Sequence, residues 1–149
     1  VCDPEREELF WGFRKGGAWL NKKAIRVSRE SRLDRALLAT GFAYDIGTAR
    51  RNNLGLFARM ARRAQGIRRP GSAAIDICWT ACGRLDGFWE MKLHPWDTAA
   101  AILLVENAGG KISRVDGRPY TVFDPDLLAS NGLLHAAMRR VLYHGKPRA

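Results

Sequence analysis

Two acidic residues near the middle of the chain stand where carboxylates could do chemistry. Glu90 lies at the end of an expected strand, and Asp97 lies at the start of an expected helix. A strand-to-helix junction presents free backbone N–H groups and the positive end of the helix dipole. Carboxylates there favour a hard cation, which prefers oxygen ligands and keeps water or substrate phosphate in its shell. The same spacing fits a structural alternative, in which Asp97 is an N-terminal helix charge and Glu90 an exposed strand residue.

A turn of small residues is the second candidate site. Gly71, Ser72 and Ala73 lead into an expected helix. Without large side chains, such a turn lets the oxygens of a ligand approach the backbone N–H groups closely. Ser72 also suits the N-cap of that helix, where its role would be structural.

The common catalytic motifs are missing from the sequence. It contains no Gly-x-Ser-x-Gly elbow, no Walker lysine motif and no His-Glu-x-x-His pair. His94 lies between Leu93 and Pro95 and has no nucleophile beside it, so we expect a buried or supporting histidine rather than a catalytic base. The five tryptophans form no regular stacking pattern, and we expect most of them in the core.

The composition is that of one globular domain. The chain has 149 residues, of which 46% are hydrophobic. No apolar run approaches the roughly 18 residues that a membrane-spanning helix needs, and no charged-then-apolar leader opens the chain. Cys2, Cys78 and Cys82 form no CxxC pair, which favours free thiols over a disulfide framework or a zinc site. We therefore expect a cytoplasmic protein without a membrane partner.

Basic residues are concentrated in one part of the chain. The net charge is +10, and the segment from Arg50 to Arg69 contains seven arginines and no acidic residue. Such a run can attract phosphate, which leaves a non-catalytic nucleic-acid-binding module as an alternative function. The run lacks the interleaved aromatic residues of single-strand binders, so a solvated helix face is the preferred interpretation.

Strand patterns and helix patterns alternate along the chain, which predicts a layered α/β domain with a mixed sheet flanked by helices. The expected strands are Leu9–Phe13, Ala18–Leu20, Ala24–Ser28, Arg35–Phe42, Ile67–Arg69, Asp86–Leu93, Lys111–Val115 and Leu127–Ala129. Apolar residues at helical spacing predict helices at 54–61, 72–83, 96–107 and 134–142. The third of these helices is apolar nearly all round, so we expect it to be buried.

Four segments share their order and spacing with a known family. They are Arg69–Asp76 (RPGSAAID), Gly83–Glu90 (GRLDGFWE), Pro95–Ala101 (PWDTAAA) and Glu106–Gly110 (ENAGG). The Trp-Asp-x-Ala signature, placed between Gly-Ser-Ala-Ala and Ala-Gly-Gly, is specific. On these motifs the sequence resembles the C-terminal part of the inositol monophosphatase family, and further matches upstream extend the resemblance over almost the whole chain.

The resemblance implies a fold and a set of site residues. Residues 1–149 would be the C-terminal portion of the layered α-β-α-β-α sugar-phosphatase fold. Within it, residues 1–48 would form the strand-rich end of the upstream sheet, and residues 49–149 would form an α/β C-terminal subdomain. By the match to the family's motifs, Asp97 would be a metal ligand, and the contacts to the sugar or polyol of the substrate would be Gly71, Ser72, Ala73 and Glu90. Tyr44 matches, more loosely, a loop position near the substrate.

The resemblance also implies a reaction and partners. The reaction would be Mg²⁺-dependent hydrolysis of a phosphate monoester, in which metal ions bridge the phosphate and polarise the attacking water. An inositol phosphate is the first substrate class to expect, while histidinol phosphate and sugar phosphates stay open. The partners would be a small phosphorylated polyol or sugar and a second copy of the chain in a homodimer.

One motif of the family is missing. The family's other metal ligands lie upstream, in a glutamate and an Asp-Pro-(Ile or Leu)-Asp-Gly-Thr motif, and no segment here matches that motif. Mg²⁺ needs several oxygen ligands, so Asp97 cannot hold it alone. We therefore expect the C-terminal portion of a longer, truncated or fragmentary polypeptide that is inactive by itself. Such a portion should expose an apolar face and aggregate or dimerise.

Overall fold

The first 24 residues form a four-stranded antiparallel sheet in the computed structural model, which describes residues 1–143. The strands follow one another in space as in the sequence: β1 (Cys2–Asp3), β2 (Glu8–Gly12), β3 (Ala18–Leu20) and β4 (Lys23–Ala24). Alternate side chains of a strand point to opposite faces of its sheet. Phe10 is therefore fully buried on the inner face, while its neighbours Leu9 and Trp11 are exposed on the outer face.

The outer face of this sheet is apolar and open to solvent. The rings of Trp11 and Trp19 stack with their centroids 4.5 Å apart. Phe13, which is 58% exposed, stacks on Trp19 in turn. This arrangement agrees with the exposed apolar face that the sequence predicts, while aggregation or dimerisation through it stays a prediction.

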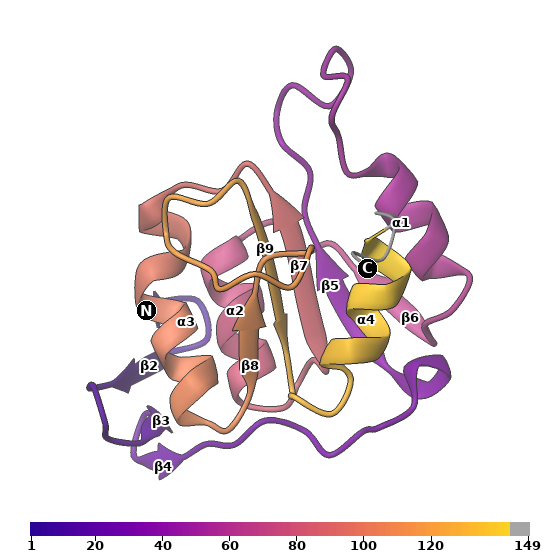
Figure 1. The fold of residues 1–149 in the computed structure, drawn as a ribbon. Coiled ribbons are helices and arrows are strands. Elements are labelled where there is room, and N and C mark those ends of the chain that lie inside the picture. Colours follow the sequence, from indigo (N-terminus) through magenta and orange to yellow (C-terminus); the bar gives the residue numbers. More distant parts are fainter. Residues whose placement is uncertain (144–149) are drawn as a thin grey trace.

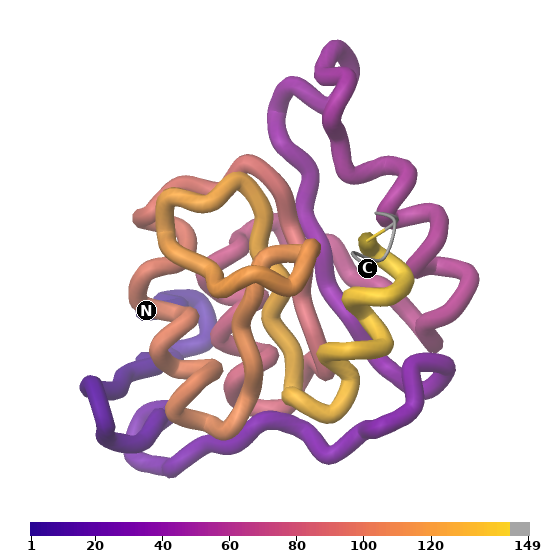
Figure 2. Tube along the Cα trace, in the orientation of Figure 1, coloured from indigo at the N-terminus to yellow at the C-terminus, as the bar shows by residue number. Residues whose placement is uncertain are grey.

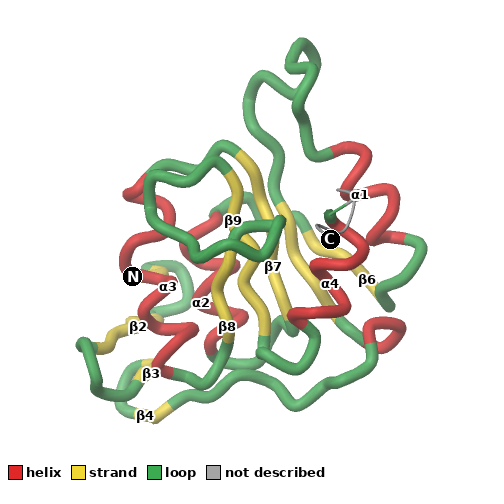
Figure 3. The backbone as a smooth tube through the Cα atoms, viewed as in Figure 1, coloured by secondary structure: helices red, strands yellow, loops and turns green. Residues whose placement is uncertain are grey.

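The second sheet has five strands and is mixed (Figure 3). Its spatial order is β6 (Gly66–Arg68), β5 (Leu37–Thr40), β7 (Gly87–Met91), β9 (Asp126–Ser130) and β8 (Lys111–Ser113). β5 runs parallel to both β6 and β7, whereas β9 runs antiparallel to both β7 and β8. The division of the chain into residues 1–48 and 49–149 stays a prediction. β5 belongs to residues 1–48 but lies inside this second sheet.

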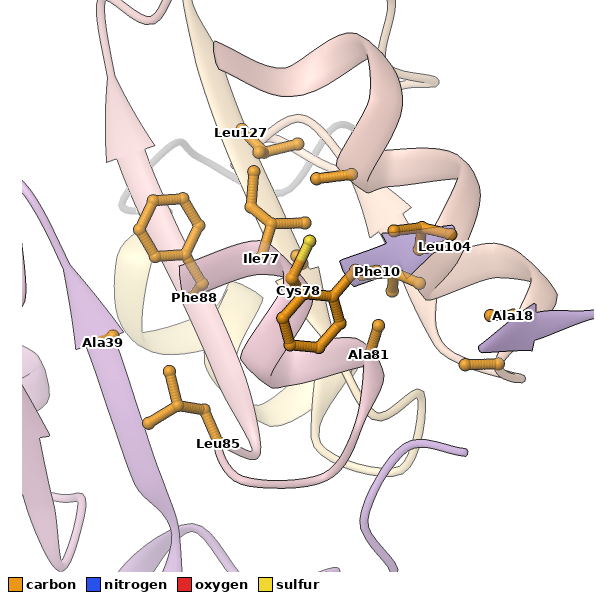
Figure 4. Close-up of a cluster of buried hydrophobic side chains, with 14 residues drawn as sticks. Phe10, Ala18, Ala39, Ile77, Cys78, Ala81, Leu85, Phe88, Leu104 and Leu127 are labelled. Atoms are coloured by element: carbon orange, nitrogen blue, oxygen red, sulfur yellow. The ribbon is translucent and has the colours of Figure 1, made fainter. Parts of the chain in front are cut away.

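Two pairs of helices cover the two faces of the second sheet (Figure 1). α1 (Leu54–Ala61) and α4 (His135–Leu142) cover one face, where Met60 and Met138 pack against Leu38 of β5. α2 (Ala73–Ala81) and α3 (Pro95–Asn107) lie between the two sheets. Figure 4 shows the core at that level, which contains Phe10, Ile77, Phe88 and Leu104. Sheet, helices, sheet and helices therefore alternate, which confirms the layered α/β fold predicted from the sequence.

All four expected helices are present, but the strand expected at Ala24–Ser28 is wrong. β4 ends at Ala24, and the residues after it are held by single contacts to other elements. The Val27 N–H donates to the carbonyl oxygen of Ala108 at 3.2 Å, and the Ser28 hydroxyl donates to the Asp86 carboxylate at 2.5 Å. The segment is anchored along the end of α3 rather than in a strand ladder, which its apolar pattern could not reveal.

The expected burial of α3 on all sides is also wrong. Its buried side chains share one face: Thr98, Ala101, Leu104 and Val105. Ala99 and Ala100 are exposed on the other face. Alanine favours a helix with or without burial, so an alanine-rich solvent face looks apolar in the sequence. Of the five tryptophans, Trp89 is the one that is fully buried, whereas most were expected in the core. Trp96, at the start of α3, is 78% exposed.

The connections after three parallel strands meet at one edge of the second sheet. The carboxyl ends of β5, β6 and β7 lie together, and from there β5 leads to α1 on one face while β7 leads to α3 on the other. In α/β proteins, ligands bind at the strand ends where the chain reverses in this way. The loop of residues 41–53 extends from this edge beyond the rest of the trace, at the top of Figure 2. None of the described helices is long and apolar enough to cross a membrane.

Asn53 ties this edge to the helix that follows. Its Oδ1 accepts the indole N–H of Trp89 at 2.7 Å, and its Nδ2 donates to the Thr40 hydroxyl and the Gly41 carbonyl oxygen, each at 2.7 Å. Because Asn53→Ala leaves buried donors and acceptors without partners, it should lower the free energy of unfolding by about 2–3 kcal/mol, measured by urea denaturation.

A neighbouring asparagine provides the control for this prediction. The side chain of Asn52 bonds only to local backbone groups near the start of α1, so Asn52→Ala should cost less than about 1 kcal/mol. Equal losses for the two variants would contradict the role given to Asn53.

Candidate functional site

A cavity of about 440 Å³, here called the strand-end cavity, lies at the carboxyl ends of β5, β6 and β7. Its wall includes all five residues that the sequence indicated: Gly71, Ser72, Ala73, Glu90 and Asp97. They come from the turn between β6 and α2, from β7, and from the first turn of α3. The fold therefore brings residues from three segments to one place, while the part that each plays in binding stays a prediction.

The turn before α2 presents backbone groups and a hydroxyl to the cavity. Gly71 has a φ of +106°, a left-handed conformation that favours glycine. Ser72 occupies the N-cap position of α2, but its side chain makes no capping hydrogen bond, unlike the structural role considered from the sequence. The N–H groups of the first turn of α2 have no partner within the helix and can bind an anion.

Glu90 reaches the cavity from β7 and lies against the end of β5. A side-chain carbon at Gly41 would overlap both carboxylate oxygens of Glu90, so only glycine leaves room for this position. Burial raises the pKa of Glu90 to about 7; Arg69 opposes this increase and Asp97 adds to it. The side chain is half-buried and lines the cavity, contrary to the exposed strand residue of the structural alternative.

Asp97 lies in the first turn of α3 and serves partly as a cap. Its Oδ2 accepts the backbone N–H of His94 at 2.8 Å, which leaves its other oxygen for a ligand. The expectation of a buried His94 is wrong, because the side chain is exposed and stacks on Trp96 with ring centroids 4.5 Å apart. The flanking apolar residues of His94 belong to a surface turn, so they do not place it in the core.

Asp76 is a cavity residue that the site prediction missed. It lies in the first turns of α2, is 1% exposed, and its Oδ1 has no hydrogen-bond partner among the described residues. Burial is the main cause that raises its pKa to about 7; the charge of Glu90 contributes to this increase and Arg69 opposes it. Two signals in the sequence could have indicated it: an acidic residue inside the apolar pattern of α2, and its place at the end of the motif Arg69–Asp76.

The loop after β5 forms the outer wall of the cavity. Tyr44 lines the opening with a fully exposed side chain, near the place that its loose resemblance implies. The neighbouring Asp45 pairs with Lys92, at 2.5 Å, and so links this loop to the residue that follows β7. Both residues of this pair also line the cavity.

The described residues do not by themselves offer a magnesium site. Within residues 1–143, no group of three or more His, Cys, Asp or Glu side chains is placed to hold a metal ion. Mg²⁺ requires several oxygen ligands in near-octahedral array. Asp97 is therefore at most one ligand of such a site.

The arginines between Arg50 and Arg69 have different surroundings. Arg51 pairs with Asp126 at 2.7 Å, Arg59 donates to carbonyl oxygens at the end of α4, and Arg69 lines the strand-end cavity. Arg62 and Arg63 line another hollow together with Arg59. Arg51 and Arg59 are thus engaged within the protein, and nucleic-acid binding by this run stays a prediction.

The alternating layers define a layered α/β protein, and carboxylates line the cavity at its parallel strand ends. Residues 1–144 match the model of the inositol monophosphatase family. The chain belongs to this family, which confirms the resemblance found in the sequence.

Individual relatives agree with this assignment. The chain is 45% identical to the inositol-1-monophosphatase of Synechocystis, over 95% of this chain and 50% of that protein. It is 38% identical to the Nus factor SuhB of Escherichia coli, over 93% of this chain and 52% of that protein. An inositol monophosphatase structure from Anabaena superimposes with a TM-score of 0.94 at 42% identity, covering 99% of this chain and 58% of the other. The chain thus spans about half the length of the curated relatives it matches.

Gly41→Ala tests the contact between β5 and Glu90. The new methyl group would displace the carboxylate of Glu90, which is the flexible end of that side chain. The melting temperature of the variant should therefore lie within about 2 °C of that of the original protein. The displaced carboxylate should become better hydrated, and the pKa of Glu90 should fall from about 7 toward its ordinary value. Carboxyl carbon NMR titration measures this shift.

Gly47→Ala is the matched control, because no atom lies within 4 Å of the position that its new side chain would take. It should leave the pKa of Glu90 unchanged. An unchanged pKa in a folded Gly41→Ala protein would show that Gly41 does not determine the position of Glu90.

The two buried carboxyls predict how stability depends on pH. An acid with a raised pKa keeps its proton in the folded state after the unfolded chain has released it, so its stabilising contribution is lost as pH rises through the folded pKa. Burial lowers the pKa of His135 to about 4, below the 6.5 of the unfolded chain. This difference makes stability increase as pH rises, but only below pH 6.5. Between pH 6.5 and 8, stability should therefore fall as pH rises, by on the order of 1 kcal/mol.

Asp76→Asn should reduce this dependence by at least half, because it removes one titrating group and its repulsion of Glu90. Urea denaturation at several pH values measures the slope. Asp116→Asn is the control, because Arg118 holds the pKa of Asp116 below its usual range, far from this window. An undiminished slope in Asp76→Asn would contradict the assignment.

Proposed function

We propose that this chain takes part in the Mg²⁺-dependent hydrolysis of a phosphate monoester, with an inositol phosphate as the substrate class. The observation that carries the proposal is the meeting of Asp97, Glu90 and the Gly71–Ala73 turn in one cavity. A cavity of this volume suits a small molecule. Its polar groups differ in character, which suits a substrate with a charged end and an uncharged end.

Each part of the cavity suits one part of such a substrate. The guanidinium of Arg69 is positive and favours the phosphate, while the backbone groups of the Gly71–Ala73 turn suit the polyol. Glu90 accepts hydrogen bonds and suits a hydroxyl of the polyol. The free oxygen of Asp97 suits a magnesium ion bound beside the phosphate.

We further propose that the chain is inactive or only weakly active by itself. Among the described residues, Asp97 is the one ligand assigned to magnesium, and its acidic neighbours form no metal-binding group. The remaining oxygen ligands would have to come from polypeptide beyond these 149 residues. We also propose that the working form is a homodimer, for which the apolar outer face of β2 and β3 offers contact area.

The choice of ester rests on a few contacts within the same cavity. The names of the Synechocystis and Anabaena relatives favour an inositol phosphate. Histidinol phosphate and sugar phosphates stay alternatives, because their phosphate end would make the same contacts and only the other end would differ.

A fusion protein tests the function. The half of the Synechocystis relative that this chain does not match would be joined to the 149 residues, and phosphate release from inositol 1-phosphate would be measured with and without Mg²⁺. We expect magnesium-dependent release. Asp97→Asn should reduce it by about 100-fold or more, because the amide is a much weaker ligand than a carboxylate.

Asp34→Asn controls for the loss of a negative charge. Asp34 is exposed and pairs with Arg32 at 2.6 Å, away from the strand-end cavity, so activity should be unchanged. Full activity of Asp97→Asn would refute the metal assignment, and a fused protein that releases no phosphate would refute the proposed function.

A further inference from the structure

The strand-end cavity contains a carboxylate that the function proposed above does not use. Asp76 lines the cavity and is 1% exposed, and its Oδ1 has no hydrogen-bond partner among the described residues. Buried polar atoms in folded proteins are nearly always hydrogen-bonded, and an unsatisfied one is costly. An unmet acceptor in the wall of a cavity therefore indicates a donor that arrives with a ligand.

The surrounding protein groups do not supply that donor. The Thr80 hydroxyl donates to the backbone oxygen of Asp76 at 3.0 Å and not to its carboxylate. Arg69 lines the same cavity and is near enough to lower the pKa of Asp76, but within residues 1–143 no hydrogen bond or ion pair joins the two side chains. Glu90, the acidic neighbour, has no proton to offer above its pKa of about 7, so at about pH 8 both carboxylates are acceptors only. Two carboxylates thus face one cavity without a donor between them.

We propose that Asp76 and Glu90 together accept hydrogen bonds from two neighbouring hydroxyl groups of the polyol, with Asp76 as a specificity-determining residue. This inference rests on the proposed function. Each ionised carboxylate is an acceptor only, so a pair of them matches a pair of hydroxyls. Their negative charge also repels a phosphate, which favours the phosphate end of the substrate lying toward Arg69.

An ammonium group is the competing ligand for such a pair. Two carboxylates attract a cation, but the positive end of the α2 helix dipole and the guanidinium of Arg69 lie at the same cavity and oppose it. Neutral hydroxyl donors satisfy both carboxylates without this repulsion. The site should therefore bind an uncharged polyol better than an amino alcohol.

The 149-residue chain itself provides the test. Binding of myo-inositol, and of inositols that each lack one hydroxyl, would be followed by NMR chemical-shift titration. At about pH 8 the original chain should bind two of these deoxyinositols about 10-fold more weakly than myo-inositol, because each loses a hydrogen bond to one of the two carboxylates. Asp76→Ala should weaken binding of myo-inositol by a similar factor, and it should no longer distinguish one of the two deoxyinositols while still distinguishing the other. This loss of discrimination separates a direct contact from a structural effect.

Two further variants keep the test decisive. Asp76→Asn preserves the size of the side chain and replaces Asp76→Ala if the latter does not fold; it should also lose the discrimination against the same deoxyinositol. Asp116→Asn removes a charge that Arg118 binds at 2.7 Å, away from the cavity, and should leave every affinity unchanged.

Several outcomes would overturn the inference. Asp76 variants that bind and discriminate like the original chain would show that water alone satisfies the carboxylate. Tighter binding of histidinol than of myo-inositol, lost in the Asp76 variants, would assign the pair to an amine. Absence of inositol binding to the original chain would also overturn it. The phosphatase function is judged separately, because phosphate release by the fused protein does not depend on Asp76 being a contact.

Discussion

The position of Glu90 depends on the absence of a side chain at the end of β5. Gly41 leaves the only room for the Glu90 carboxylate beside that strand, and the parallel register of β5 and β7 sets the two residues next to each other. The hydrogen bonds of Asn53 to Trp89 and to the Gly41 carbonyl hold that register from the other side. The turn before α2 and the first turn of α3 are arranged around this contact, because they leave the same edge of the sheet.

The electrostatics of the cavity oppose those of the chain as a whole. The protein carries a net charge of +10, yet its cavity gathers the carboxyls of Asp76, Glu90 and Asp97 with Arg69 as their basic neighbour. Burial raises the pKa of Asp76 and Glu90 to about 7, which means that their ionised forms are costly in the folded protein. Carboxyls with strongly raised pKa values are frequent at binding sites, which agrees with the polyol contacts proposed for this cavity.

The motif residues of the cavity could be predicted because their local chemistry is visible in the sequence. A glycine before an N-cap, and an acid after a proline at a helix start, indicate helix N-termini by themselves. The role of Asp76 could not be predicted in this way. The position of Asp76 within an apolar stripe does not show that it is buried near Glu90. That burial depends on strands from other parts of the chain, whose packing is set by contacts distant in the sequence.

Local spacing alone determined where the four helices lie and which turn and junction could bind a ligand, because helical period, capping and turn chemistry act over a few residues. Tertiary structure decided which surfaces are buried. Tertiary packing ends β4 at Ala24 and buries Asp76. It also leaves the side chains of Trp96 and His94 exposed and sets the arginines of the run beside separate hollows. The physical reason is that burial is a property of packing, and the packing partners of each residue come from distant parts of the chain.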